Sequence, residues 1–372
     1  MIKFTLQSLR RLRLQMQGLN SELLLNDVAQ VTRNACGLQS QELPAATLAV
    51  RARTGGLTAD DVRHAREVAR SIILTWTMRG TMHLVAAEDV GWQLQLFGAL
   101  FIHKRQRRYR QLGLDDTTRR NAVHFMRNVL GSRGPMNRAE LAQILGKHGI
   151  PVEGQAIAHL VSYAALQGII CFGPERSGKP TYVLLEDWAK TEDNRIFSEK
   201  QLVAELTRRY LRAFAPAAPS DMASWSGLAA GQIRAGFEAI SNDLIEVEIP
   251  NGKAWMLKDQ VEHSQHTSRD RNVRFLPRYD NYLLGYQSRD FIVQESFARE
   301  VHPGGGLIRS AVIVDGQVIG VWQLEQKRGV ARIIVQPFET IDAELVPYLE
   351  AEAQDIGRFL QTEALLSIVS PQ

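Results

Sequence analysis

The hydrophobic positions in the first part of the chain follow a strand period and then a helix period. The apolar runs 72–76 and 82–85 flank Arg79-Gly80, which is typical of a β-hairpin. Apolar residues then recur every three or four positions from 90 to 101, which predicts a long helix with one buried face. Because further helical segments precede the hairpin, the order of elements is that of a winged helix.

The same order of elements recurs twice. A capping box, Asn137-x-x-Glu140, opens a helix; a second apolar-faced helix and two β-type runs follow, the last ending near residue 185. Between residues 202 and 257, helical segments precede two runs that enclose Asn251-Gly252, a strong hairpin turn. These repeats share organisation rather than sequence, and they predict winged helices in tandem.

The pattern changes to strands from about residue 270. The runs 307–314 and 318–324 enclose Asp315-Gly316, and residues 341–360 have a helical pattern. We therefore predict a mainly α chain with β structure (α+β), in which a β-rich domain follows the winged helices. The expected ranges are 1–115, 116–195, 196–260 and 261–372.

Composition and charge narrow the class of protein. The 372 residues contain no apolar run of membrane-spanning length and open with no signal peptide, so we expect a cytoplasmic protein. Cys36 and Cys171 stand in apolar surroundings and are predicted to be small buried hydrophobes. The net charge is +4, and residues 103–110 form the densest basic run. Such a run fits a polyanion such as nucleic acid, or alternatively a solvated helix end.

Two motifs that suggest ligands are rejected. Residues 173–179 match most of a phosphate-binding loop, but Pro180 replaces the Ser or Thr that binds magnesium, and a strand follows. We interpret the segment as a wing loop whose Arg176 and Lys179 touch a DNA backbone. His263 and His266 have no accompanying ligands and are interpreted as surface histidines, so no metal is expected.

Gln39 and Gln41 stand between two predicted helices. In a tight turn both side-chain amides can point toward one cleft and hold a water molecule, although neither can act as a strong base. The alternative is a pair of capping or solvated glutamines. Similarly, Arg79 can bind a phosphate with His83 beside it, or the two can be a turn residue and a hydrogen-bonded histidine.

Four segments resemble winged-helix DNA glycosylases of the AlkZ and YcaQ kind and occur in the same order. They are Gly37–Gln41, Trp76–Leu84, Leu276–Tyr286 and the hairpin Val312–Gln323. The resemblance covers nearly the whole chain. It implies tandem winged helices, a C-terminal β-rich domain and a C-shaped DNA-binding surface. It also implies excision of alkylated purines and, in some members, unhooking of interstrand crosslinks.

The family's catalytic element is a Gln, an aliphatic residue, and then Gln or Asp. It falls on Gln39 and Gln41, as in the AlkZ branch, with Ser40 in place of the aliphatic residue. An N7-alkylpurine is already cationic and leaves without a strong general acid, so a positioned water suffices. The resemblance therefore implies a monofunctional hydrolase without a cofactor, acting as a monomer on double-stranded DNA with alkylated purines. The expected DNA-contacting residues are Arg79, His83, Lys104, Arg105, Arg107, Arg108, Arg176, Lys179, Arg278 and Asp280.

Two other functions remain open from the residues alone. A winged-helix transcriptional regulator would use the same basic surface and read bases with a helix at 155–167. A protein that binds lesions without cutting them would share the surface as well. For Asp280 the alternative to a place beside the sugar cation is a capping residue in a turn.

Overall fold

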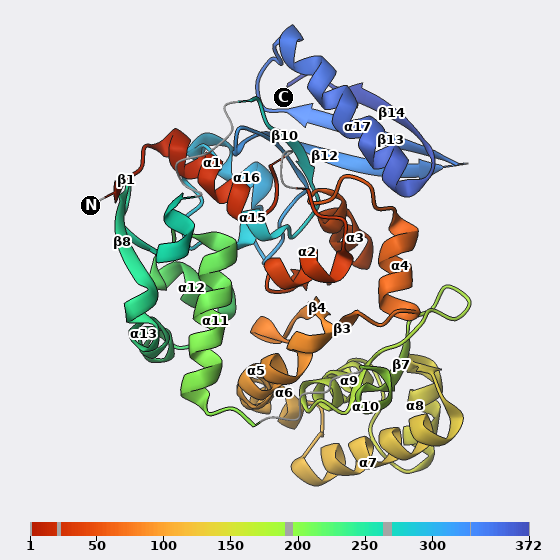
Figure 1. Cartoon of the computed structure of the whole chain (residues 1–372). Coiled ribbons are helices and arrows are strands. Elements are labelled where there is room, and N and C mark those ends of the chain that lie inside the picture. Colours follow the sequence, from red (N-terminus) through yellow and green to blue (C-terminus); the bar gives the residue numbers. More distant parts are fainter. Residues whose placement is uncertain (1, 21–23, 190–195, 263–269, 328, 372) are drawn as a thin grey trace. The chain divides into compact units, whose positions relative to one another are not determined.

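The computed structural model separates into two compact units (Figure 1). The described residues are 2–20, 24–189, 196–262, 270–327 and 329–371. Unit 1 comprises Met1–Val62 and Val203–Gln372, and unit 2 comprises Arg63–Leu202. Segments at both ends of the chain therefore pack into one unit, and the four domain ranges expected from the sequence stay predictions.

Unit 2 begins with the predicted hairpin. Strands β3 (Ile72–Trp76) and β4 (Met82–Ala86) pair antiparallel, and α5 (Val90–Lys104) follows. The basic run begins at the end of the predicted long helix and continues into a second helix, α6 (Gln106–Gln111). Arg105, with φ −97° and ψ 2°, leaves helical geometry between the two helices.

The rest of unit 2 has the order of elements predicted for the second winged helix. Its elements are α7 (Asp116–Arg133), β5 (Met136–Asn137), α8 (Arg138–Lys147), α9 (Ala156–Leu166), β6 (Ile170–Phe172), β7 (Thr181–Leu184) and α10 (Leu185–Trp188). The strand order is β5-β7-β6, and the capping box of Asn137 and Glu140 is present. Cys171 is buried in the core that joins β3 and β4 to β6 and β7, as predicted.

The described residues of the N-terminal part of unit 1 form four helices and two short strands. They are β1 (Ile2–Lys3), α1 (Leu6–Met16), α2 (Val28–Asn34), β2 (Leu38–Gln39), α3 (Leu43–Arg51) and α4 (Ala59–Glu67), whose end enters unit 2. The basic N-terminus is turned partly inward. Arg13 is buried over the rings of Tyr286 and Phe291, 3.9 and 4.1 Å from their centroids, and donates to the carbonyl of Pro216.

Unit 1 continues with the elements of the third predicted repeat. These are α11 (Glu199–Phe214), α12 (Pro219–Ser226), α13 (Ala230–Ala239), β8 (Leu244–Ile249) and β9 (Gly252–Leu257). Strand β1 pairs parallel with β8, so the first residues of the chain extend a sheet formed some 240 positions later. This pairing is one reason that both ends of the chain share a unit.

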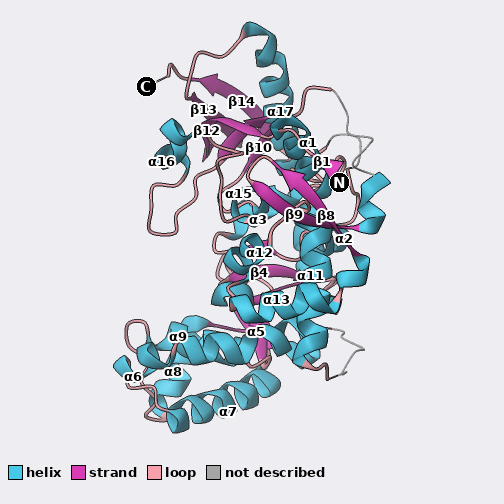
Figure 2. Cartoon of the chain, turned by 90° about the vertical axis from the view of Figure 1, so that its left-hand side faces the viewer, coloured by secondary structure: helices cyan, strands magenta, loops and turns pink. Residues whose placement is uncertain are grey.

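A five-stranded sheet forms the C-terminal part of unit 1. Its strands are β10 (Val273–Leu276), β11 (Ala311–Val314), β12 (Gln317–Lys327), β13 (Val330–Pro337) and β14 (Glu363–Ile368), in that order. The predicted Asp315-Gly316 turn joins β11 and β12, with both residues at positive φ. Helix α17 (Val346–Leu360) packs on β10 and β14 (Figure 2), and α15 (Asn281–Leu284) and α16 (Ala298–Val301) precede β11. The mixed α and β fold class is confirmed.

A buried ion-pair network connects α3 to this C-terminal part. Arg51, 1% exposed, donates to Glu352 at 2.9 Å and Asp355 at 3.2 Å, both on α17. Its other terminal nitrogen donates to the carbonyl of Phe275 at 2.7 Å. The helix that follows Gln39 and Gln41 is therefore anchored at its far end. No helix among the described residues is long and apolar enough to cross a membrane.

Candidate functional site

The glutamine turn, residues 35–42, starts where α2 ends. The N–H of Cys36 donates to the carbonyl of Arg33, and that of Gly37 to Thr32, both at 2.9 Å. This pair of bonds is a Schellman motif, which requires positive φ after the helix; φ is 54° at Cys36 and 95° at Gly37. The chain is thus turned sharply before Leu38.

The two glutamine side chains meet in this turn. The side-chain nitrogen of Gln39 donates to the side-chain oxygen of Gln41. Between them, the Ser40 side chain is buried and its hydroxyl donates to the carbonyl of Leu38 at 2.8 Å. Gln39 is 8% exposed and Gln41 is exposed. The pair therefore presents neutral hydrogen-bonding groups that can orient a water molecule, while Ser40 packs inward as the middle residue.

Asn281 holds the backbone of the glutamine turn in place. Its side-chain nitrogen donates to the carbonyl of Ala35 at 3.0 Å and to that of Gly37 at 2.9 Å. Both amide protons are used, and the residue is 3% exposed. Asn281 was missed in the sequence analysis, although it lies within the segment Leu276–Tyr286 that carries the family resemblance. Only the fold brings it within reach of residues 35–37.

Asp280, the residue before Asn281, is buried and forms an ion pair inside unit 1. Its carboxylate binds Arg53 through two bonds of 2.8 and 2.9 Å, and its side chain has no exposed area. It also caps α15 by accepting the N–H of Tyr282. The structure therefore places Asp280 as the capping residue that the sequence left as the alternative, and we do not include it among the proposed DNA contacts.

Arg278 lies at the edge of the glutamine turn. Its guanidinium is 2.7 Å from Glu42, the residue after Gln41, and both side chains are more than one-third exposed. Of the residues predicted to contact DNA, Arg278 is the one that the structure brings to the glutamine turn from the C-terminal part of unit 1. It stays a candidate DNA contact.

Arg79 lies in unit 2 on the turn between β3 and β4, and His83 lies on β4 next to that turn. Burial lowers the pKa of Arg79 to about 10. Burial also lowers the pKa of His83 to about 3, with a further contribution from the charge of Arg79. Its Nδ1 donates to the carbonyl of Thr81 at 3.1 Å. His83 is therefore neutral at pH 7 and is unsuited to act as a general acid there.

The basic run divides into outward and inward residues. Lys104 and Arg107 are exposed. Arg105 instead donates to the carbonyl of Gly80 at 2.5 Å and to the hydroxyl of Ser162 at 3.0 Å. Gly80 has φ 65°, and a Cβ there would lie 2.9 Å from the Arg105 guanidinium, so this contact requires glycine. Arg105 therefore holds the β3–β4 turn.

Three further predicted contacts lie in unit 2, Arg108 on α6 and Arg176 and Lys179 on the loop between β6 and β7. Arg108 donates to the side-chain oxygen of Gln155 at 2.6 Å. The loop 173–180 joins β6 and β7, two strands, so it is a hairpin and not a phosphate-binding loop. On this loop Arg176 pairs with Glu140, whereas Lys179 is exposed at the turn.

The helix that a sequence-reading regulator would use is α9. It packs against α5, α7, α8, β3 and β6, and nine of its residues are buried. Only Ala158 and His159 within it are partly exposed. A helix that reads base edges needs several accessible polar side chains, and α9 lacks them.

The predicted His263 and His266 lie outside the described residues.

Comparisons with known proteins match this fold. A family model described as DNA glycosylase AlkZ-like matches residues 32–359. A protein of Streptomyces sahachiroi named interstrand DNA cross-link repair glycosylase is 27% identical over an alignment of 347 residues, and the match covers 89% of this chain and 90% of that protein. The solved structure of Streptomyces sahachiroi DNA glycosylase AlkZ has a TM-score of 0.85 at 22% identity, covering 99% of this chain and 100% of that one. At that identity the likeness concerns the fold.

Proposed function

Because the chain belongs to the AlkZ-like family of DNA glycosylases, we propose that it hydrolyses the N-glycosidic bond of N7-alkylated purines in DNA. The observation that carries the proposal is the hydrogen-bonded pair of Gln39 and Gln41 on a turn held rigid by Asn281. Rigid placement matters because a positioned water gains most of its advantage from fixed orientation. Crosslink unhooking, the activity in the relative's name, is part of the proposal.

The reaction balances without a strong acid or base. The C1′–N9 bond breaks, and the purine leaves with the bonding electrons, which neutralise the positive charge that alkylation placed on its ring. The water oxygen held by Gln39 and Gln41 bonds to C1′, and its proton passes to bulk solvent. Neutral amide oxygens oriented toward the sugar also stabilise the positive charge that develops there. Because the attacking group is water, we expect an abasic site and no strand cleavage.

The direct test is base release from a duplex that contains a single N7-methylguanine. We expect free N7-methylguanine and abasic sites with the wild-type protein. Under single-turnover conditions the rate should fall about 100-fold in Gln39→Ala and in Gln41→Ala, the range for removing one positioned polar group. Gln30→Ala, which removes an exposed glutamine on α2, is the matched control and should react at the wild-type rate.

Three readouts separate the alternatives. Borohydride should trap no protein–DNA adduct, because no lysine forms a Schiff base in a monofunctional enzyme. A duplex with an N7–N7 guanine crosslink should be converted to separable strands on a denaturing gel. Tight binding to damaged DNA without base release, or sequence-selective binding without release, would contradict the proposal in favour of a lesion-binding protein or a regulator.

A further inference from the structure

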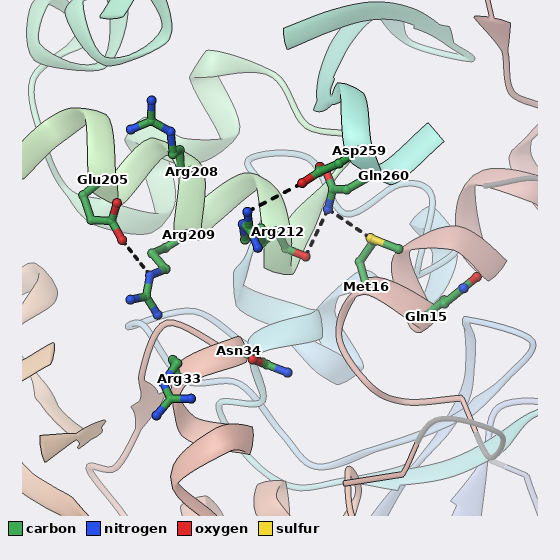
Figure 3. A pocket seen from close by; sticks show the side chains of 10 residues that line it. All are labelled: Gln15, Met16, Arg33, Asn34, Glu205, Arg208, Arg209, Arg212, Asp259 and Gln260. Carbon is green, nitrogen blue, oxygen red and sulfur yellow. Dashed lines mark hydrogen bonds and ion pairs between the residues drawn. The ribbon is translucent and has the colours of Figure 1, made fainter. Parts of the chain in front are cut away.

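A pocket of about 640 Å³ in unit 1 is lined by four arginines (Figure 3). Arg33 comes from the last turn of α2, and Arg208, Arg209 and Arg212 come from α11. We call it the arginine pocket. It lies in the same unit as the glutamine turn, and none of its arginines belongs to the site described above. So many guanidinium groups around one pocket call for an explanation in terms of a ligand.

The three arginines of α11 belong to a single polar stripe, in which Arg212 is exposed and Arg208 and Arg209 are partly exposed. Together with Glu205 they stand at intervals of three, one and three residues, which places them on one face of the helix. The four residues between them in sequence are fully buried. The helix orientation is therefore fixed by its apolar side, and the polar stripe faces the pocket. Arg209 extends from this stripe toward Arg33 (Figure 3).

The carboxylates of the pocket only partly neutralise its arginines. Arg209 binds Glu205 at 2.8 Å, and Arg212 lies 3.6 Å from Asp259. Arg208 also lies 3.1 Å from Asp243, which is outside the lining. Three acids therefore face four arginines, and the formal charge of this group is +1 (4 − 3). Ion pairs with this degree of exposure are weak and screened by salt, which means that a phosphate can displace or join the carboxylate. Guanidinium groups bind phosphate oxygens through paired hydrogen bonds.

Hydrogen bonds of one side chain join two of the helices that line the pocket. The side-chain nitrogen of Gln260 lies 3.1 Å from the carbonyl of Leu211, 3.3 Å from that of Arg212 and 3.2 Å from the sulfur of Met16 (Figure 3). One side chain thus joins the end of α11 to the end of α1. The pocket is formed before any ligand arrives, which reduces the entropy lost on binding.

We propose that the arginine pocket binds the phosphodiester backbone of the DNA strand beside the lesion. Arg209 and Arg212 are three residues apart on a helix, about 4.5 Å along its axis. Both side chains therefore project from one side of α11 and can contact the same stretch of a DNA strand.

The place of Arg33 connects this contact to the proposed chemistry. Its carbonyl accepts the N–H of Cys36 in the glutamine turn, so a phosphate held at Arg33 is bound at the helix end that positions Gln39. The assignment rests on the proposed glycosylase function and adds the residues that hold the DNA strand for it.

Salt dependence of binding to undamaged duplex DNA tests the contact. The slope of log affinity against log salt should decrease by about one for each phosphate contact removed. We expect this decrease in Arg209→Gln and Arg212→Gln, and about twice as much in the double variant. Arg309→Gln is the control, since Arg309 is exposed and paired with Glu300 at 3.2 Å elsewhere in unit 1. Unchanged slopes, or an equal decrease in the control, would overturn the assignment.

Neutral phosphates locate the contact on the DNA. A single methylphosphonate is placed at successive positions on either side of an N7-methylguanine, and affinity is measured for wild type and for the R209Q/R212Q variant. We expect positions near the lesion at which the wild type loses affinity and the double variant does not, because the same contact is already missing. If both proteins respond alike at every position, the pocket does not bind the backbone.

Two further outcomes separate this inference from the proposed function. If the wild type releases base and the R209Q/R212Q variant binds DNA with the affinity of the wild type, only the pocket assignment fails. If the wild type releases no base yet the variant shows the lower slope, the glycosylase proposal fails and the contact stands. Stabilisation of wild type by inorganic phosphate, absent in the variant, with equal DNA slopes, would assign the pocket to small anions instead.

Discussion

The glutamine turn of unit 1 and the β3–β4 turn of unit 2 are built alike but differ in which of their polar side chains reach the solvent. Each carries two polar side chains that the sequence marked as candidates, and each has a residue at positive φ. In the first, Gln41 is exposed and joined to Gln39. In the second, burial lowers the pKa of both Arg79 and His83. Arg79 is nevertheless partly exposed, and only His83, at 2%, is fully buried. The first turn thus places a neutral amide at the surface, and the second places a partly exposed guanidinium beside a buried neutral histidine.

The difference follows from what holds each turn. Both turns are held by a side chain that donates to their carbonyls: Asn281 to Ala35 and Gly37, and Arg105 to Gly80. Asn281 approaches from within unit 1 and leaves the exposed side of the turn open. Arg105 packs directly on the turn, within 3 Å of where a Cβ on Gly80 would stand. The glutamine turn therefore keeps Gln41 at the surface, whereas beside the β3–β4 turn the His83 ring is enclosed and Arg79 stays partly accessible.

The largest effect should come from breaking the support beneath the glutamine turn. Asp280→Asn leaves the buried guanidinium of Arg53 without an opposing charge. We expect a loss of about 3–5 kcal/mol in the free energy of unfolding, measured with urea. A loss below about 1 kcal/mol would mean that Arg53 finds another partner, and it would remove the distinction between buried support and exposed site.

Asn281→Ala tests the direct support of the turn. Two carbonyls lose their donor, and we expect a loss of about 2 kcal/mol in the free energy of unfolding. The single-turnover rate of base release should fall about tenfold, while the affinity for DNA stays at the wild-type value, because misplacement of the amides affects only the chemical step. Weaker DNA binding at an unchanged rate would show that Asn281 acts on binding rather than on the position of Gln39.

Local sequence patterns were sufficient for the elements on both sides of this comparison. The β3–β4 hairpin, the capping box at Asn137 and the Asp315-Gly316 turn were predicted from residues within a few positions of each other, and the structure contains them. The break between α5 and α6 was not predicted from the periodicity, and it falls at Arg105. Its side chain contacts Gly80 and Ser162, which local periodicity cannot reveal.

The site was predictable only in part. The meeting of Gln39 and Gln41 was one of the two possibilities that the sequence left open, and the structure shows their side chains hydrogen-bonded. Which polar residues become buried was not anticipated, because coverage depends on segments far away in the chain. Asp280 and Arg53 meet across 227 positions, and Asn281 reaches Ala35 across 246. The arginine pocket was missed for the same reason, since Arg33 and Arg209 share no local pattern.

The covered turn predicts a pH dependence of stability. The pKa of His83 is about 3 in the folded protein and about 6.5 when unfolded, so below pH 6.5 the unfolded state binds a proton that the folded state excludes. Stability is therefore lost as pH falls, by about 2 kcal/mol at pH 5. His83→Asn should reduce the change in unfolding free energy between pH 7.5 and 5 by that amount. Burial also lowers the pKa of His302 to about 4, but this residue is present in both proteins. Its contribution to the pH dependence is therefore the same in wild type and variant, and it cancels in the difference.

The smallest effect on stability is expected at the exposed edge of the glutamine turn. Arg278→Gln removes an ion pair with Glu42 in which both side chains are more than one-third exposed, so the free energy of unfolding should change by less than about 1 kcal/mol. If Arg278 contacts a phosphate, the salt slope of DNA binding should fall by about one while the rate at saturating protein is unchanged. A fall in that rate with an unchanged slope would instead make the pair with Glu42 a positioning contact for Gln41. Arg278 would then belong with Asn281 among the residues that hold the turn, and the exposed side of the turn would depend on its neighbours as much as the buried side does.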